Sequence, residues 1–464
     1  MKKRIMSLNM IKIFHTLLVI CPFLLCWFLY YEPNTLTATS RQVSALVITV
    51  YIVIYYTLCL KLDGFRASVV GITEMIYSQI ISAALADVCA ALGIWMLSIW
   101  LPNLFPGFLC FLGQCVIIFI LCQLEYRSYY KHHKPWRTLV VYDARQGVEK
   151  LISAYGLEQR YEIRKVIPVE EILNHLDVLD EIETVFLSGI HSRERNNILK
   201  ECIYRDIQVY IIPRVGDVLM SGAEQMHMLH LPFLRSKRYR PLSEYRVLKR
   251  ILDIAFSGVA LILFSPVMLV TAIAVKMDGG PAFYKQTRLT IGGKEFKILK
   301  FRSMCVDAEK MSGAVLSSGK DDPRITKVGR IIRACRVDEL PQLLNIFAGD
   351  MSIVGPRPER PEIAAVYEKQ LPEFSLRLQA KAGLTGYAQV YGKYNTTPYD
   401  KLLMDLMYIS GASLFMDLQI ALETIRILFD KRSTEGLGDE SVSLVYSERT
   451  EPRKDNTQSH HSDK

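Results

Sequence analysis

Paired cysteines are missing from this 464-residue sequence: none of its ten cysteines forms a Cys-x-x-Cys pair, and seven lie before residue 125 in apolar surroundings. This spacing argues against a zinc site and a disulfide framework, so we interpret the cysteines as buried, reduced thiols. Acidic residues are also in the minority, because 56 Lys and Arg against 47 Asp and Glu give a formal net charge of +9. A basic balance is compatible with nucleic acid, an anionic membrane surface or phosphorylated substrates.

Charged residues are nearly absent from four long apolar runs in the first third of the chain. The runs cover residues 13–31, 43–60, 76–101 and 108–124, and each can cross about 30 Å of hydrocarbon at about 1.5 Å per residue. Asp87 is the single Asp, Glu, Lys or Arg inside a run, which gives little sign of an ion pathway. The first run is too long for a removable signal peptide and lacks a small-residue cleavage site. We therefore expect residues 1–130 to form a four-helix transmembrane anchor in a lipid bilayer.

The charges that flank these runs predict the orientation of the anchor. Basic residues precede the first run, separate the second from the third, and follow the fourth: Lys2, Lys3, Arg4, Lys61, Arg66, Arg127, Lys131, Lys134 and Arg137. The other two loops, 32–42 and 102–107, hold a single basic residue, Arg41. Because cytoplasmic loops carry the excess of Lys and Arg, we expect both ends of the anchor in the cytoplasm.

A glycine-rich phosphate-binding turn is missing from the next region. Short β-branched runs at 138–142, 184–187 and 208–212 alternate with helix-like stretches, which predicts a parallel sheet and a Rossmann-like α/β domain over 137–215. The turn after the first strand, Asp143–Gly147, holds one glycine, so the G-x-G-x-x-G cradle is absent. A nucleotide site stays open, but we favour a structural, regulatory or oligomerisation module. Residues 216–244 are expected to be a linker.

A fifth apolar run, 251–275, is long enough to span a membrane but has features that argue against crossing. Lys249 and Arg250 precede it and Lys276 follows it, so neither flank favours export. Ser265-Pro266 falls near its middle, where a proline removes a backbone donor and kinks a helix. We expect a re-entrant helix–break–helix that enters and leaves on one face. The alternative is a proline-kinked span, which would place everything after residue 276 outside the cell.

Residues 278–410 are dense in Gly, Pro, Arg and Asp set in short strings. In chain order the strings are Gly279-Gly280-Pro281, Phe283-Tyr284-Lys285-Gln286, Lys300-Phe301-Arg302-Ser303-Met304, Asp322-Pro323-Arg324-Ile325-Thr326, Arg336-Val337-Asp338-Glu339-Leu340-Pro341, Gly349-Asp350-Met351-Ser352, Val354-Gly355-Pro356-Arg357-Pro358 and Gly383-Leu384-Thr385-Gly386. Most of these strings are weak signals by themselves, but the whole set in this order is specific. It resembles the bacterial sugar transferase family, the monotopic polyprenyl-phosphate phosphoglycosyl transferases, over residues 245–430.

The resemblance implies both an architecture and an activity. Long members of the family have four N-terminal spans, a degenerate nucleotide-fold domain and an α+β catalytic domain with a re-entrant membrane helix. They transfer a sugar 1-phosphate from a UDP-sugar, here expected to carry glucose or galactose, to undecaprenyl phosphate with release of UMP. This is the first membrane step of exopolysaccharide, capsule or O-antigen synthesis, on the cytoplasmic face of the bacterial inner membrane. The family requires Mg²⁺, and a homodimer through the middle domain or the anchor is a further expectation.

The Asp338-Glu339 pair is the expected catalytic dyad. By resemblance, Asp338 is the nucleophile that forms an aspartyl phosphosugar, and a carboxylate is competent for such covalent catalysis. Glu339 is expected to bind Mg²⁺ or to assist the second step; Mg²⁺ needs only a carboxylate or two plus substrate phosphates. A competing interpretation is a helix-capping pair, with Pro341 in the first turn of the helix. The two interpretations are compatible.

Cationic residues around the dyad are the expected substrate ligands. Arg357 stands between two prolines and resembles the family's phosphate-binding arginine, whose planar fork suits a phosphate. Lys300 and Arg302 alternate on an expected strand, so both should face the diphosphate or uridine. Arg333 precedes the dyad, on one helical face with Arg336 at i, i+3 spacing. The remaining expected ligand by resemblance is Asp405; for each of these residues a plain surface position is the competing interpretation.

Two other classes of protein compete with this prediction. A catalytically inactive, membrane-anchored regulator would need no dyad, yet both Asp338 and Arg357 are present. A nucleic-acid-binding protein is not expected, because the basic residues are spread along loops among Gly and Pro and are not interleaved with aromatics on one face. The tail, 431–464, is polar and poor in aromatics, and we expect it to be disordered.

Overall fold

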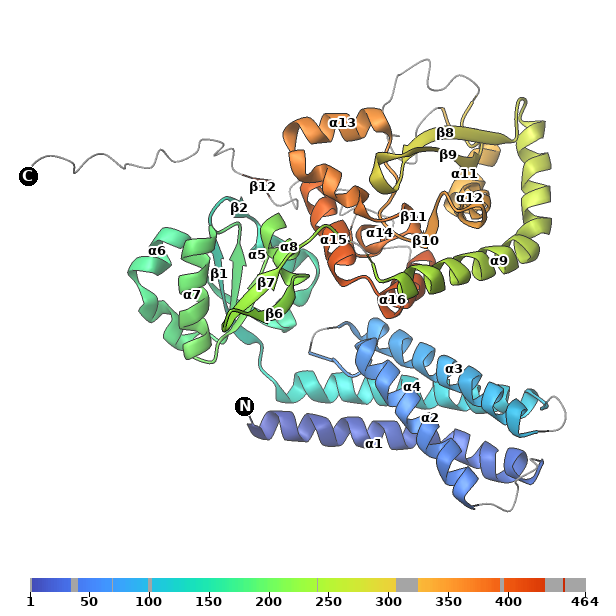
Figure 1. Cartoon of the computed structure of the whole chain (residues 1–464). Helices are drawn as coiled ribbons and strands as arrows, with labels where there is room; N and C mark the ends of the chain where they lie inside the picture. The colour runs from blue at the N-terminus through green and yellow to red at the C-terminus, as the bar shows by residue number, and fades with distance from the viewer. Residues whose placement is uncertain are drawn as a thin grey trace, which may run out of the picture. The chain divides into compact units, whose positions relative to one another are not determined.

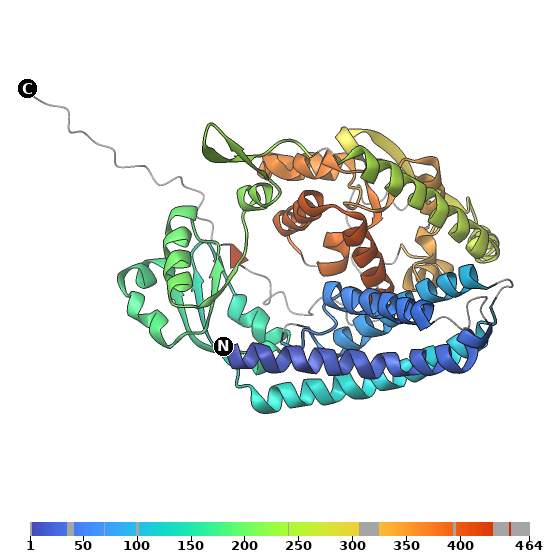
Figure 2. The same ribbon diagram turned by 60° about the horizontal axis from the view of Figure 1, so that its bottom comes forward.

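Four apolar helices form the N-terminal region of the computed structural model, which describes residues 2–34, 41–68, 70–98, 102–239, 241–305, 324–392, 396–429 and 445–446. They are α1 (Lys2–Cys26, extended by η1, Trp27–Tyr31, and η2, Glu32–Asn34), α2 (Arg41–Lys61), α3 (Ile72–Leu97) and α4 (Phe105–His132). The four run alongside one another (Figure 2), and each is long and apolar enough to cross a membrane. The prediction of four long apolar helices at the N-terminus is confirmed.

Polar side chains inside this bundle bond to one another between helices. Tyr51 of α2 donates to Asp87 Oδ1 of α3 at 2.7 Å, and Gln114 of α4 donates to the Tyr51 hydroxyl at 2.8 Å. Tyr51 also stacks on Phe23 of α1, with ring centroids 3.8 Å apart. In lipid the hydrophobic effect does not drive helices to associate, so side-chain hydrogen bonds and close packing hold them together. The mid-span Asp87 is therefore part of the contact between helices.

The middle region contains a four-stranded parallel sheet in the order β3-β1-β4-β5. Its strands are β1 (Trp136–Tyr142), β3 (Tyr161–Pro168), β4 (Thr184–Ser188) and β5 (Gln208–Ile211), and its helices are α5 (Val148–Ala154), α6 (Val169–Asn174) and α7 (Ser192–Tyr204). Leu139, Val140 and Val141 of β1 are fully buried, as expected for a strand with neighbours on both sides. The parallel sheet that the alternating pattern predicted is confirmed.

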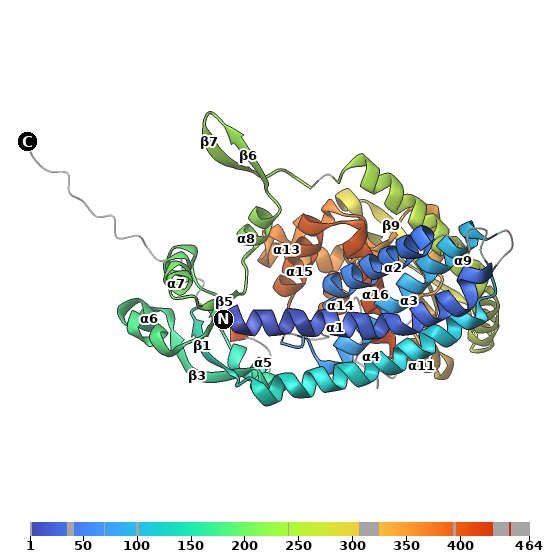
Figure 3. The same cartoon turned by 90° about the horizontal axis from the view of Figure 1, so that it is seen from below.

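The expected linker, 216–244, contains regular elements. Helix α8 (Val215–Ser221) is followed by an antiparallel hairpin of β6 (Glu224–Met228) and β7 (Leu231–Arg235) (Figure 3). Its two-residue loop, Leu229 and His230, has positive φ at both positions, which is the type I′ geometry of tight hairpins. The usual sequence for this turn is Asn-Gly, so Leu-His gave no signal for it.

Helix α9 (Ser243–Met277) is a single 35-residue helix that bends along its length (Figure 1). The expected break at Ser265-Pro266 is not observed, because the helix continues through it. Pro266 cannot donate to the carbonyl of Ile262, and the Ser265 hydroxyl donates to that carbonyl instead, at 2.8 Å. The serine thus satisfies the acceptor that the proline leaves without a partner, and the helix bends without breaking.

Both halves of α9 contact the same C-terminal domain. In the first half, Asp253 is 5% exposed and accepts hydrogen bonds from Ser352 Oγ and the Ile353 amide. In the second half, Val275 packs with Phe301 and Ile332. The outward face is apolar and exposed; it includes Ile251, Phe256, Val259, Ile262, Leu263, Leu269, Val270 and Ile273. The helix is therefore anchored on one side and offers a long apolar surface on the other.

The C-terminal domain combines helices with two-stranded sheets. Strands β8 (Phe283–Leu289) and β9 (Glu295–Phe301) are antiparallel, whereas β10 (Ser352–Val354) and β11 (Gly383–Thr385) are parallel. Around them lie α11 (Lys327–Ala334), α12 (Gln342–Ala348), α13 (Pro361–Gln370), η7 (Pro372–Gln379), α14 (Tyr387–Tyr391), α15 (Pro398–Gly411) and α16 (Leu414–Phe429). Of the tail, 431–464, only Val445–Tyr446 is described, as β12 paired with β2 (Arg145–Gln146); the expected disorder lies outside the described residues.

Candidate active site

The Asp338-Glu339 pair lies in a tight turn between two helices. Helix α11 ends at Ala334, Arg336 adopts a left-handed conformation with φ of 53°, and a 3₁₀ turn, η6 (Val337–Glu339), carries the two carboxylates. Val337 packs against the Val275 cluster of α9, which ties the turn to the apolar helix. The next helix begins at Gln342 after Pro341, without a side-chain cap. The helix-capping interpretation of the pair is therefore not observed.

Two cations converge on one oxygen of Glu339. Lys300 of β9 donates to Oε1 at 2.8 Å, and Arg357, which follows β10, donates to the same oxygen at 3.3 Å. The side chains of Glu339 and Lys300 are 16% and 20% exposed, whereas Arg357 is 46% exposed. Arg357 therefore has open guanidinium surface beside the dyad, as a ligand for an incoming anion requires.

The two neighbouring carboxyls have opposite pKa shifts. Burial raises the pKa of Asp338, and the adjacent charge of Glu339 raises it further. Burial by itself would also raise the pKa of Glu339, but the charges of Arg357 and Lys300 outweigh it and hold that pKa well below its usual range. Burial lowers the pKa of Lys300, against the pull of Glu339. Carboxyls with separated pKa values take different roles in catalysis: Glu339 stays ionised and paired, and Asp338 is the more basic.

The loop between β10 and α13, residues 355–360, presents Arg357 and is called the Arg357 loop. Its backbone is fixed by close approach to the string that begins at Gly383. The Gly355 amide donates to the Thr385 carbonyl at 2.9 Å, and the Gly383 amide donates to the Pro356 carbonyl at 3.0 Å. A Cβ on Gly355 would lie 2.2 Å from the Lys381 carbonyl oxygen, so no other residue fits there. These contacts explain why the Gly355 and Gly383 strings occur together although 28 residues separate them.

Arg302 does not join Lys300 at the site. It lies just past the end of β9, is 8% exposed, and donates to the carbonyls of Pro281 and Val275. The prediction that it faces the diphosphate with Lys300 is therefore wrong, because the strand alternation does not extend to residue 302. Arg333 does lie nearby: it donates to Ser303 Oγ at 2.9 Å, and its charge acts to lower the pKa of Asp338.

Arg333 and Arg336 do not share a helical face. Helix α11 ends two residues before Arg336, whose left-handed backbone turns the chain into η6. The i, i+3 argument assumed a continuous helix up to the dyad, and the turn ends it early. Arg336 is instead the hinge residue that directs Asp338 and Glu339 away from the axis of α11.

Asp405 is not a surface acid, and its charged partner is Arg377. It is 1% exposed in α15, and burial raises its pKa against the effect of Arg377. Its Oδ2 lies 2.7 Å from Arg377 Nη2, and Glu359 lies 3.5 Å from the same guanidinium. Sequence reasoning did not identify Arg377, Glu359 or Arg288, since these charges lie far apart along the chain and no local pattern marks them as neighbours.

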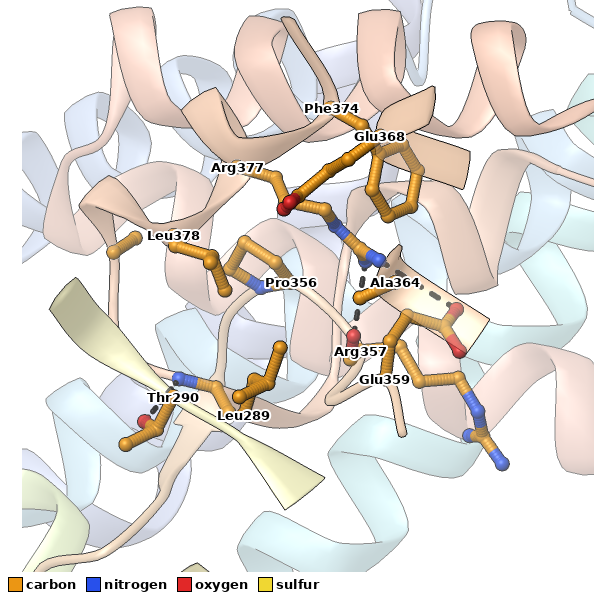
Figure 4. A pocket seen from close by; sticks show the side chains of 12 residues that line it. Leu289, Thr290, Pro356, Arg357, Glu359, Ala364, Glu368, Phe374, Arg377 and Leu378 are labelled. Carbon is orange, nitrogen blue, oxygen red and sulfur yellow. Dashed lines mark hydrogen bonds and ion pairs between the residues drawn. The ribbon is translucent and has the colours of Figure 1, made fainter. Parts of the chain in front are cut away.

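A small pocket lies behind the Arg357 loop, among Leu289, Pro356, Phe374 and Leu378. Its enclosed space is about that of one water, too small for a sugar or a base. Figure 4 shows the Arg377 guanidinium directed at the Arg357 carbonyl and Glu359, whereas the Arg357 guanidinium points away from the pocket. The pocket therefore lies on the opposite side of the loop from the Arg357 guanidinium, which contacts Glu339.

The carboxylate pair has a donor set that suits Mg²⁺. Among the described residues, no group of three or more His, Cys, Asp or Glu side chains could hold a metal. Mg²⁺ does not need such a cage, because one or two carboxylates complete its octahedron with substrate phosphates and waters. Both cation contacts of Glu339 fall on Oε1, so Oε2 is the oxygen that can face a metal.

These features define a membrane protein in which two adjacent carboxylates, one of them contacted by two cations, lie beside a long apolar helix. The family model for bacterial sugar transferases matches residues 244–431. A UDP-glucose:undecaprenyl-phosphate glucose-1-phosphate transferase of Caulobacter vibrioides is 43% identical over 183 residues, which cover 38% of this chain and 68% of that protein. The chain therefore belongs to the bacterial sugar transferase family.

The names of two further relatives give N-acetylgalactosamine as the sugar, whereas the name of the Caulobacter protein gives glucose. A UDP-N-acetylgalactosamine-undecaprenyl-phosphate N-acetylgalactosaminephosphotransferase of Aeromonas hydrophila is 36% identical over 239 residues, 51% of this chain. The matched segment spans 55% of the length of that relative. A putative undecaprenyl-phosphate N-acetylgalactosaminyl 1-phosphate transferase of Bacillus subtilis is 47% identical over 137 residues, which cover 29% of this chain and 75% of that protein.

Proposed function

We propose that this protein transfers a sugar 1-phosphate from a UDP-sugar to undecaprenyl phosphate, releases UMP, and so starts the synthesis of a bacterial polysaccharide. The observation that carries the proposal is the Asp338-Glu339 pair with its opposite pKa shifts, faced by Lys300 and the half-exposed Arg357. A site of this kind offers a nucleophile and fixed positive charge to a diphosphate, which is what phosphoryl transfer needs. The names of the relatives describe the same kind of reaction and support the proposal.

The reaction proceeds in two displacements at phosphorus. An Asp338 oxygen attacks the phosphorus that bears the sugar, forms an O–P bond, and the bond to the UMP oxygen breaks, so that UMP leaves with the electron pair. An oxygen of undecaprenyl phosphate then attacks the same phosphorus and releases the Asp338 carboxylate. Arg357 binds the negative charge that develops on the phosphoryl oxygens, and Lys300 keeps Glu339 ionised in place.

Magnesium is part of the proposal. Oε2 of Glu339 and the Asp338 carboxylate would hold the ion, together with diphosphate oxygens of the donor. Bound there, Mg²⁺ neutralises the diphosphate and favours departure of UMP. Removal of the ion with EDTA is expected to stop turnover, and added Mg²⁺ to restore it.

We also propose that α9 is re-entrant and that the C-terminal domain lies on the cytoplasmic face of the inner membrane. The contacts of Asp253 and Val275 with one domain support this topology, since a straight span would carry its two ends to opposite sides of the bilayer. The bend of α9, a helix that contains Pro266, lets the apolar face enter the lipid and return. UDP-sugars are supplied on the cytoplasmic side, in keeping with the basic residues at both ends of α9.

Labelling of Cys305, which is exposed and follows α9, tests the topology. In a full-length variant that keeps this cysteine alone, a membrane-impermeant maleimide applied to intact spheroplasts should leave it unlabelled until the membrane is permeabilised. A cysteine introduced at Asn103, in the loop expected outside, is the positive control. Labelling of Cys305 in intact spheroplasts would mean that α9 crosses the membrane.

Release of UMP by the purified protein in detergent tests the reaction. Undecaprenyl phosphate, Mg²⁺ and a panel of UDP-sugars are supplied one sugar at a time, starting with glucose, galactose and N-acetylgalactosamine. Release with one sugar, and none without lipid or Mg²⁺, would establish the reaction and name the donor. If the folded protein releases no UMP with any sugar of the panel, an inactive, membrane-anchored regulator would be favoured.

A further inference from the structure

A buried arginine lies on the far side of the Arg357 loop. Arg377, in η7, has a side chain that is 4% exposed, with Asp405 Oδ2 at 2.7 Å from Nη2 and Glu359 Oε1 at 3.5 Å from Nη1. Its guanidinium also stacks over Phe374, 4.9 Å from the ring centroid. Two acids and an aromatic ring thus enclose the cation, so a substrate cannot reach it.

Arg377 reaches the main chain of the loop that presents Arg357. Its Nη2 donates to the Arg357 carbonyl at 2.9 Å, and Arg288 Nη1 donates to the next carbonyl, that of Pro358, at 3.0 Å. Pro356 and Pro358 have no backbone N–H, so the loop cannot be fixed by a regular ladder of backbone hydrogen bonds. Two guanidinium groups, that of buried Arg377 and that of half-buried Arg288, hold one side of the loop while the Arg357 side chain reaches Glu339 from the other.

We propose that Arg377, itself held by Asp405, is a positioning residue that fixes the Arg357 main chain and so aims the Arg357 guanidinium at the donor diphosphate. The inference rests on the proposed function, because it takes Arg357 as the phosphate ligand. A misplacement of about 1 Å can cost on the order of a hundredfold in rate. Nη2 of Arg377 contacts both the Asp405 carboxylate and the Arg357 carbonyl, while Nη1 lies near Glu359. Lysine at position 377 keeps the charge but has a single nitrogen and no planar guanidinium to make these three contacts together.

A double-mutant cycle separates positioning from general stabilisation. Arg377→Lys, Arg357→Ala and the double variant are compared by kcat and KM for the UDP-sugar, from UMP release by the full-length protein. Arg377→Lys should lower kcat by about tenfold in the wild-type background and by less than about twofold in the Arg357→Ala background. A residue that acted only on folding would lower the rate by the same factor in both, and that result would overturn the proposal.

Matched variants keep the cycle interpretable. Arg195→Lys changes an arginine of the middle region that is 11% exposed and bonded to Asp217, and it should leave kcat unchanged. If Arg377→Lys does not fold, Asp405→Asn replaces it in the same cycle, because it removes the charge that pairs with Arg377 and keeps the size of the side chain. Equal factors in both backgrounds would overturn the proposal in the same way. No UMP release by the wild type would overturn the proposed function and this inference together. An active wild type with equal factors in the two backgrounds would overturn this inference alone.

Discussion

Two clusters of acids and cations flank the Arg357 loop, and they differ in access to solvent. The open cluster is Glu339, Lys300 and Arg357, with side chains 16%, 20% and 46% exposed. The closed cluster is Asp405, Arg377 and Glu359, with side chains 1%, 4% and 18% exposed. The same functional groups thus occur on both sides of one loop. The clusters differ mainly in their arginines, because Arg357 is half-exposed and Arg377 is buried, whereas Glu339 and Glu359 are similarly exposed.

The energetics of ion pairs explain the difference. A half-exposed pair contributes little to stability, so Arg357 can exchange Glu339 for a phosphate at small cost. A buried pair is strongly destabilising to break, because the remaining charge has no water to solvate it. The closed cluster is therefore suited to hold the loop, and the open cluster is suited to exchange partners with the substrate. Four substitutions test this division, in decreasing order of expected effect.

The largest effect is expected for Asp338→Asn, in the turn beside the open cluster. The amide is not a nucleophile, so turnover should fall by more than about a thousandfold, and no covalent phosphosugar should appear on the intact protein by mass spectrometry. Asp177→Asn, an exposed position in the middle region, is the control and should retain wild-type rate. A near-normal rate in Asp338→Asn would exclude the covalent mechanism.

Arg357→Ala removes the exposed cation of the open cluster and should lower kcat/KM by roughly 10²–10³-fold, as for other donors aimed at developing charge. Arg357→Lys should recover part of the loss, because it restores the charge but not the fork. Lys369→Ala, at an exposed position of α13, should leave the rate unchanged. An unaltered rate in Arg357→Ala would make Arg357 a surface residue, and the open cluster would lose its proposed role.

The sequence allowed the open cluster to be predicted better than the closed one. Lys300, Glu339 and Arg357 stand in dense strings that recur as an ordered set, and the structure brings the three together. Arg302 stands in the same string as Lys300, yet its guanidinium turns toward Val275, because where a strand ends is decided by tertiary packing. Arg377 had no local signal, since its partners lie 18 and 28 residues away along the chain.

The fold shows the same limit. Four apolar runs predicted α1–α4 well, because a membrane span depends on length and composition alone. The run at 251–275 has the same composition, yet α9 packs along its buried face against the C-terminal domain through Asp253 and Val275. Hydropathy alone could not predict that α9 packs against this domain, because that contact depends on a few buried side chains along one face of the helix. The hairpin at 224–235 was missed because its turn residues are unusual ones.

A third test compares the stability of the two clusters. Asp405→Asn weakens the buried pair with Arg377 and should lower the free energy of unfolding by about 1–3 kcal/mol, seen as a lower thermal midpoint of the solubilised protein. Glu339→Gln, in the open cluster, should change the thermal midpoint less. It should also lower the rate of turnover and raise the Mg²⁺ concentration that gives half of the maximal rate. Equal midpoint shifts in the two variants would mean that both clusters are structural, contrary to the division proposed here.

The smallest effect is expected on the pH dependence of the rate, which reports on Asp338 beside the open cluster. Burial and the charge of Glu339 raise the pKa of Asp338, so the rate should fall on acidification at a higher pH than an ordinary aspartate would give. Glu339 does not contribute to this acid limb, because Arg357 and Lys300 hold its pKa well below the range where the rate falls. The limb therefore reports protonation of the nucleophile.

Lys300→Met tests the assignment of that limb. The positive charge of Lys300 acts to lower the pKa of Asp338, so its removal should raise that pKa and move the acid limb of kcat/KM to higher pH. Lys300→Arg keeps the charge and should leave the limb near its wild-type position, although the rate itself can change. Asp405 should not contribute, since it lies in the closed cluster and meets no substrate; Asp405→Asn should therefore leave the limb in place. If the acid limb moved in Asp405→Asn and not in Lys300→Met, the titration would belong to the closed cluster, and the proposed roles of the two clusters would be reversed.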